Sequence, residues 1–103
     1  MIRILLAEDD ESMRLYLARA LERVGYDVTA VDRGTAAVPL LEQERFDLLL
    51  TDIVMPEMDG IELAQRAAEI APDAKVLSKP FHLKDLVMEV DRMFQTEDQH
   101  GRL

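Results

Sequence analysis

The sequence contains no cysteine and no tryptophan, and only 12 basic residues stand against 21 acidic residues among its 103. Without cysteine there can be neither a disulfide framework nor thiolate chemistry, as expected for a cytoplasmic protein. The net charge of −9 opposes binding to nucleic acid phosphates and to anionic lipid surfaces. No segment reaches the roughly 18 apolar residues that a membrane helix requires. These absences favour one globular domain without a membrane or DNA-binding role.

Short apolar runs alternate with helical patterns along the chain. The runs predict strands at residues 2–7, 27–31, 46–51 and 74–78. Amphipathic spacing predicts helices at about 11–24, 34–43 and 61–71, and a last helix after Pro80. The apolar side of the third helix is predicted to include Ile61, Ala64, Ala67, Ala68 and Ala71. Regular alternation of this kind predicts a doubly wound α/β fold, a parallel sheet with helices on both faces.

Acidic residues follow two of the predicted strands. Glu8, Asp9 and Asp10 come directly after the first strand, and Asp52 follows the third. If these strands are neighbours, their carboxylates crowd one pocket at the carboxyl edge of the sheet, where ligands bind in such folds. A hard divalent cation such as Mg²⁺ would relieve the repulsion. The alternative is that the acids after the first strand are solvated charges that favour the dipole of the following helix.

Asp52 and Lys79 could carry phosphoryl chemistry. An aspartate held at a strand end can act as a nucleophile toward a phosphoryl group and form an acyl phosphate. Lys79 follows the fourth predicted strand and could pair with Asp52 or with a phosphoryl oxygen. Read separately, Asp52 could equally be a turn residue and Lys79 a solvated surface charge.

Three segments together resemble the signature of response-regulator receiver domains, which are CheY-like proteins. They are LLAEDD at 5–10, DIVMPEMDG at 52–60 and KPF at 79–81, and they occur in the family's order. The resemblance implies a flavodoxin-like fold in which Asp52 is the phosphoacceptor and Lys79 contacts the phosphoryl group. It implies a Mg²⁺ site formed by Glu8, Asp9, Asp52 and the main-chain carbonyl of Val54. The implied donor is a histidine kinase or a histidine phosphotransfer protein, and the only implied catalysis is of the domain's own phosphorylation and dephosphorylation.

Within the family, the chain resembles the CpdR-type single-domain receivers, cell-cycle regulators that act on the ClpXP protease. The resemblance implies output by protein–protein contact, with a ClpX-type protease component as a candidate partner. Residues 1–95 are predicted to form the receiver domain, and residues 96–103 a frayed polar tail.

The spacing departs from the family in one place. Only seven residues separate Ala71 from Lys79, whereas the family has a further strand and helix there. One β-α unit of about 20 residues is therefore missing. Ser78 is the only candidate for the family's switch hydroxyl, and Val76 stands where the switch aromatic is expected.

The deletion leaves two ways to close the sheet and two functions open. Either the last strand moves beside the third, giving four strands in the order 2-1-3-4, or another chain fills the gap. Loss of a helix also exposes apolar surface, which predicts a homodimer, with strand swapping as one form. The chain is then either a phosphorylatable receiver or a non-switching interaction protein that keeps the receiver scaffold and dimerises.

Overall fold

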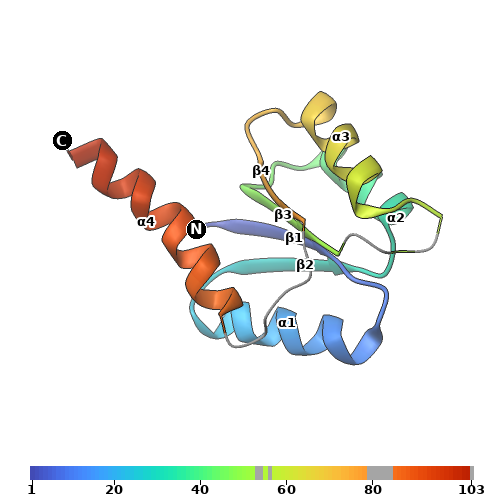
Figure 1. Cartoon of the computed structure of the whole chain (residues 1–103), viewed down its shortest axis with the longest axis horizontal. Coiled ribbons are helices and arrows are strands. Elements are labelled where there is room, and N and C mark those ends of the chain that lie inside the picture. Colours follow the sequence, from blue (N-terminus) through green and yellow to red (C-terminus); the bar gives the residue numbers. More distant parts are fainter. Residues whose placement is uncertain (53–54, 56, 79–84, 103) are drawn as a thin grey trace.

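The computed structural model describes residues 1–52, 55, 57–78 and 85–102, with side chains as far as Phe94 except that of Ser78. Four strands form one sheet: β1 (Arg3–Ala7), β2 (Asp27–Val31), β3 (Leu48–Thr51) and β4 (Lys75–Ser78). Four helices alternate with them: α1 (Glu11–Arg23), α2 (Gly34–Gln43), α3 (Gly60–Ile70) and α4 (Leu86–Arg102) (Figure 1). The predicted alternation of strands and helices is confirmed.

The strands are all parallel and lie in the order β2-β1-β3-β4. This is the four-strand order expected if the last strand moves beside the third to close the gap. The last residues of the strands are aligned, because Ala7 pairs with both Val31 and Thr51, and Thr51 pairs with Ser78. All four strands therefore end at the same edge of the sheet, and the acidic residues that follow β1 and β3 are brought to that edge.

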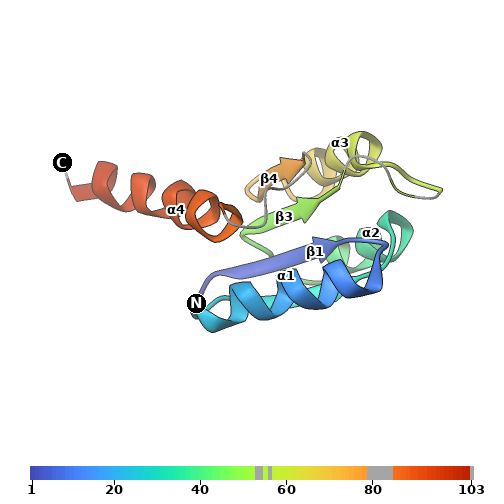
Figure 2. The same cartoon turned by 60° about the horizontal axis from the view of Figure 1, so that its bottom comes forward.

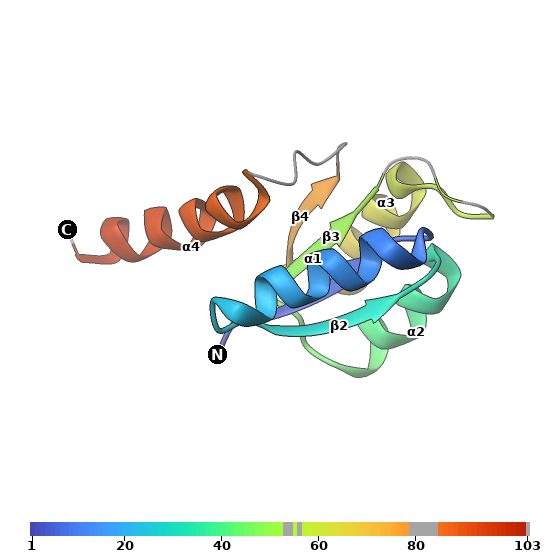
Figure 3. The same ribbon diagram turned by 90° about the horizontal axis from the view of Figure 1, so that it is seen from below.

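Helices cover both faces of the sheet (Figures 2 and 3). Helices α2 and α3 pack on one face, where the buried residues are Leu5, Ala7, Ala37, Leu41, Phe46, Leu49, Met55, Leu63 and Ala67. Helices α1 and α4 pack on the other face, where the buried residues are Ile4, Leu6, Leu17, Leu21, Leu48, Leu50, Leu86 and Val90. Alternate residues of β1 and β3 thus enter opposite cores, which explains why these strands are continuous apolar runs.

Two helical details differ from the sequence-based predictions. In α3 the predicted apolar side is confirmed at Ala67, which is buried, but it was wrong at Ile61, which is 56% exposed, and it missed the buried Leu63. The helix begins at Gly60, with Asp59 as its N-cap, and the buried Leu63 and Ala67 are four positions apart, on one side of the helix. At the other end of the chain, α4 continues to Arg102 through residues predicted as a frayed tail. This part of α4 projects beyond the sheet (Figure 3).

None of the described helices is both long enough and apolar enough to cross a bilayer.

Candidate functional site

The carboxyl edge of the sheet brings together three of the predicted site residues. Glu8 and Asp9 follow β1, Asp52 follows β3, and these two strands are direct neighbours. Since Ala7 and Thr51 pair in register, Glu8 and Asp52 are corresponding residues just beyond the ends of adjacent strands. The negative charges of Asp52 and Asp9 both act on the Glu8 carboxyl. The sequence-based expectation that these acids share one edge is therefore met by the backbone register.

Glu8 is the buried member of this group, with only 4% of its surface exposed. Its amide donates to the carbonyl of Val31 at 3.1 Å, which extends the β1–β2 pairing by one residue. Its carboxylate Oε2 accepts a hydrogen bond from the amide of Asp10 at 3.0 Å. Burial raises the pKa of the Glu8 carboxyl above its ordinary value of 4.5, and the nearby carboxylates of Asp9 and Asp52 raise it further, while the Asp10 amide opposes the change.

The raised pKa of Glu8 predicts a loss of stability as the pH increases. The folded state holds the Glu8 proton more tightly than the unfolded state, so stability is fully present below pH 4.5 and is lost as the pH rises through the folded-state pKa. Glu8→Gln should remove this loss and make the protein more stable than the wild type at neutral pH, with little difference below pH 4.5. Urea unfolding in EDTA at several pH values measures the effect, with Glu11→Gln on the exposed start of α1 as the control. Equal pH profiles for wild type and Glu8→Gln would contradict it.

Asp10 has a structural role. Its carboxylate accepts a hydrogen bond from the amide of Met13 at 2.8 Å and caps the start of α1. Asp59 caps α3 in the same way, accepting from the amide of Glu62 at 2.8 Å. Each cap satisfies a backbone donor that the helix leaves unpaired. The alternative interpretation, that an acid after β1 serves the following helix, therefore holds for Asp10.

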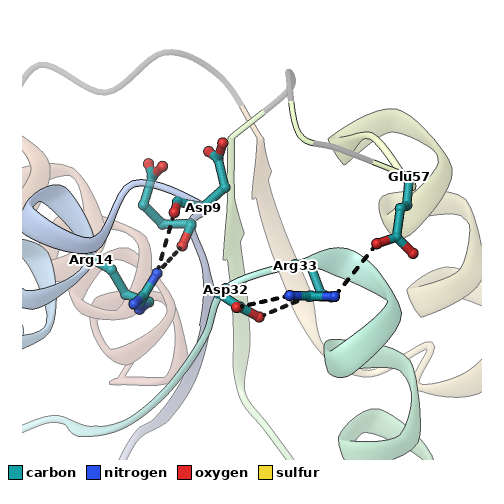
Figure 4. Close-up of polar contacts among 6 residues, drawn as sticks. Asp9, Arg14, Asp32, Arg33 and Glu57 are labelled. Carbon is teal, nitrogen blue, oxygen red and sulfur yellow. Dashed lines mark hydrogen bonds and ion pairs between the residues drawn. The ribbon is translucent and has the colours of Figure 1, made fainter.

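An arginine on α1 fixes the segment that carries the two acids. Arg14 donates from Nη1 to the carbonyl oxygen of Glu8 at 2.9 Å and to that of Asp9 at 3.4 Å (Figure 4). These bonds hold the main chain of Glu8 and Asp9 in place. The same turn is held by the hydrogen bond from the amide of Asp10 to the Glu8 carboxylate. Arg14 thus adds positive charge at the acidic edge and fixes the turn out of β1. Nothing in the sequence singles out this role, because it depends on the side chain folding back over the turn before α1.

The predicted phosphoacceptor, Asp52, is half-buried at the end of β3. The hydroxyl of the preceding residue, Thr51, donates to the carbonyl of Asp52 at 3.0 Å and contacts Met55 Sδ at 3.7 Å. The main chain of Ser78 lies beside Thr51 in the β3–β4 ladder. The other predicted residues, Val54 and Lys79, lie outside the described residues.

The donor set at this edge suits a hard cation. Glu8, Asp9 and Asp52 offer only carboxylate oxygens, and the pKa of Glu8 is raised by burial first and then by the nearby Asp9 and Asp52. Over the described part of the chain, no three acidic or histidine side chains are arranged to hold a metal ion among themselves. Mg²⁺ does not require such a cage, because it binds through one or two carboxylates and completes its shell with water and phosphate oxygens. The residues present therefore fit Mg²⁺, and the assignment of Glu8, Asp9, Asp52 and Val54 as its ligands stays a prediction.

A second group of charges lies at the same edge and was missed by the sequence analysis. Arg33, just after β2, pairs with Asp32 and reaches Glu57 in the segment between β3 and α3 (Figure 4). The hydrogen bond from Arg33 lowers the pKa of Asp32, and Arg14 lowers it further through its charge. The contact joins residues 24 positions apart, so no local pattern in the sequence could reveal it.

Comparison with known proteins agrees with this geometry. The family model described as "Response regulator receiver domain" matches residues 4–78. The response regulator receiver protein CpdR of Brucella abortus (strain 2308) is 54% identical over 116 residues, covering 90% of this chain and 97% of the relative. That alignment is longer than the 103 residues of this chain, so the relative has residues that this chain lacks.

Solved structures share the fold. The receiver domain of the hybrid histidine kinase CckA has a TM-score of 0.74 and 30% identity, with 87% of this chain and 96% of that one covered. The response regulator protein TrrA of Thermotoga maritima, in complex with Mg(2+)-BeF, has a TM-score of 0.78 and 24% identity, with 89% of this chain and 98% of that one covered. The likeness to TrrA concerns the fold alone.

Proposed function

Because this chain belongs to the response regulator receiver domain family of two-component systems, we propose that Asp52 accepts a phosphoryl group from a phosphohistidine. The donor would be a histidine kinase or a histidine phosphotransfer protein. The observation that carries the proposal is the position of Asp52 beside Glu8 at the carboxyl edge of the sheet, where the charge of Asp52 acts on the Glu8 carboxyl. The proposed activity is limited to self-catalysed phosphorylation and dephosphorylation, and the proposed location is the cytoplasm.

The reaction requires little more than a positioned carboxylate and compensation of charge. A carboxylate oxygen of Asp52 forms a bond to phosphorus while the bond from phosphorus to the donor imidazole nitrogen breaks, and the electron pair stays with the imidazole. Lys79 directly follows β4, the strand beside β3, and we propose that it contacts the transferred group. The main chain of Ser78, in register with Thr51, is consistent with Ser78 supplying the switch hydroxyl.

Glu8 and Asp9 would hold Mg²⁺ together with Asp52 and the carbonyl of Val54. When bound, the ion would neutralise charge on the phosphoryl oxygens. Arg14 holds the carbonyl oxygens of Glu8 and Asp9, so the main chain that carries both carboxylates is fixed before any cation binds. The Mg²⁺ complex of the structural relative TrrA is consistent with this proposal.

Phosphorylation by a small-molecule donor tests the proposed function. Incubation of the full chain with acetyl phosphate and Mg²⁺ should increase its intact mass by one phosphoryl group, and EDTA should prevent the increase. Unchanged mass of the wild-type chain in Mg²⁺ would contradict the proposal and favour the non-switching alternative.

We further propose an output by protein–protein contact, similar to that of CpdR-type receivers, with a ClpX-type protease component as one candidate partner. The 54% identity to CpdR over most of both chains supports this choice. Residues 1–95 are proposed as the receiver domain.

A second candidate function is that of a non-switching scaffold that forms a homodimer. Exchange of a strand between the two chains is one form that this dimer could take. The observation that favours it is the position of β4, which pairs with β3 on one side and has no second strand beside it among the described residues. Val76 and Leu77 of this strand are only partly buried, although each packs against one of the two cores. Exposed strand edges pair readily with other chains.

The homodimer predicts a mass of two chains in light scattering. The dimer should persist on dilution through the micromolar range, and mixing of isotopically labelled and unlabelled chains should show exchange between partners. A monomeric mass at every concentration up to the millimolar range would contradict it.

A further inference from the structure

The segment that leads from β3 to α3 is held against the start of α2 by an arginine. Arg33 is the N-cap residue of α2, and its guanidinium forms two bonds to the Asp32 carboxylate, Nε to Oδ1 at 3.0 Å and Nη2 to Oδ2 at 3.2 Å. The remaining nitrogen, Nη1, lies 3.5 Å from Oε1 of Glu57 (Figure 4). Asp32 therefore orients the guanidinium so that it points across the edge of the sheet toward Glu57.

Gly34 makes a second and independent contact with the same segment. A Cβ added at Gly34 would lie 3.0 Å from the carbonyl oxygen of Met58 and 3.2 Å from its Cβ and Cγ. A side chain at position 34 would therefore press on Met58, which would have to move by a few tenths of an ångström, whereas glycine allows the close approach without such a shift. Met58 also packs against the core between α2, α3 and the sheet.

The backbone of this segment is strained where Arg33 reaches it. Glu57 has a φ of 68°, and in the described part of the chain it is the only residue other than glycine with a positive φ. A left-handed conformation is unfavourable for a side chain such as that of glutamate. It persists where surrounding contacts determine it, and here Arg33 contacts Glu57 itself while Gly34 contacts the next residue, Met58.

The strained segment is continuous with the proposed phosphoacceptor. Asp52 lies five residues before Glu57, and Asp59, two residues after it, is fixed as the N-cap of α3. Met55, between them, is buried and contacts the hydroxyl of Thr51. The contacts of Glu57 and Met58 with α2 therefore lie within six residues of Asp52 along the chain, and Met55 between them is held against Thr51.

We infer that Arg33 and Gly34 are positioning residues for Asp52: they hold Glu57 and Met58 against α2 and so set the orientation in which the acceptor carboxylate meets a phosphoryl donor. This inference rests on the proposed function of Asp52. It assigns to the β2–α2 turn a part in phosphoryl acceptance, although no residue of that turn is placed in contact with the transferred group.

A double-mutant cycle on the rate of phosphorylation by acetyl phosphate in saturating Mg²⁺ tests the inference. Arg33→Ala and Glu57→Gln should each slow the reaction about threefold, the scale of an exposed ion pair, and the double variant should be no slower than either single variant. Arg33→Lys should recover part of the rate. Gly34→Ala should slow the reaction about tenfold, because the added methyl group displaces Met58. Arg66→Ala, on the exposed side of α3, is the matched control.

Methyl NMR of methionine-labelled protein gives a readout that does not depend on phosphorylation. The Met58 signal should shift in Arg33→Ala and in Gly34→Ala, while that of Met88, exposed on α4, stays in place. Multiplicative effects in the cycle, unchanged rates, or an unmoved Met58 signal would each overturn the inference. If the wild type accepts no phosphoryl group, the proposed function fails, and the Met58 signal alone then decides whether the two contacts hold the segment.

Discussion

Replacing Asp52 by alanine should abolish acceptance of a phosphoryl group, with the rate reduced on the order of 10³-fold or more. The substitution removes the nucleophilic oxygens, and Glu8 cannot replace them because its carboxylate is buried and bound to the amide of Asp10. Intact mass after incubation with acetyl phosphate and Mg²⁺ measures the loss. The variant should remain folded, since removal of the Asp52 charge relieves the repulsion that raises the pKa of Glu8.

The matched control is Asp73→Asn, an exposed aspartate in the turn between α3 and β4. This substitution also removes one negative charge, but at the opposite end of the strands from Asp52. The phosphorylation rate of the variant should therefore equal that of the wild type. Retention of the modification in Asp52→Ala would assign the acceptor to another carboxylate. A loss in both variants would point to the overall charge of the protein rather than to the site.

Truncation of Leu50 should produce the largest loss of stability. This side chain is fully buried on β3, between β1 and β4, and packs in the core under α1 and α4. Leu50→Ala removes its apolar contacts and leaves a cavity, at a cost of about 3–4 kcal/mol. In a domain whose total stability is about 5–15 kcal/mol, this should lower the melting temperature by about 10–25 °C. Thermal unfolding followed by circular dichroism measures the change.

The same substitution on the surface provides the comparison. Leu15 lies on α1 and is 47% exposed, so Leu15→Ala should change stability by about 0.5 kcal/mol or less. Equal losses in the two variants would show that β3 is not the centre of the packed structure.

The sequence predicted the sheet well because the deletion left few ways to close it. Apolar runs indicate strands buried on both faces, and the short spacing between Ala71 and Lys79 leaves no room for a fifth strand and its helix. An empty position within the sheet would leave backbone groups unpaired at a cost of about 1–3 kcal/mol for each buried group. These two facts left two ways to close the sheet, the last strand beside the third or a strand from another chain, and the observed order β2-β1-β3-β4 is the first of them. On α3 the prediction included the buried Ala67 but chose Ile61 in place of Leu63, since several apolar residues on different sides of the helix fit a helical spacing.

The sequence predicted that the acids lie at one edge of the sheet, but it did not predict the contacts that support them. Acids after two strands of a parallel sheet are expected to meet, and Glu8 and Asp52 do so. The sequence could not show which acid is buried, which one caps a helix, or that Arg33 reaches Glu57. Those properties depend on side chains that cross between segments distant in sequence, and they follow only from the folded arrangement.

The place of β4 at the rim of the sheet also determines how the molecule comes apart locally. A strand with one ladder partner is held by half the main-chain bonds of an interior strand, so β4 should belong to a cooperative unit that opens at lower free energy than β1 and β3. Its last residue lies beside Thr51, one position before the proposed acceptor. A phosphoryl group that binds residues at the end of β4 would therefore stabilise one of the two edge strands of the sheet. Phosphorylation would then change how often β4 unfolds locally. A partner protein could respond to that change even if the packed conformation of the domain stayed the same.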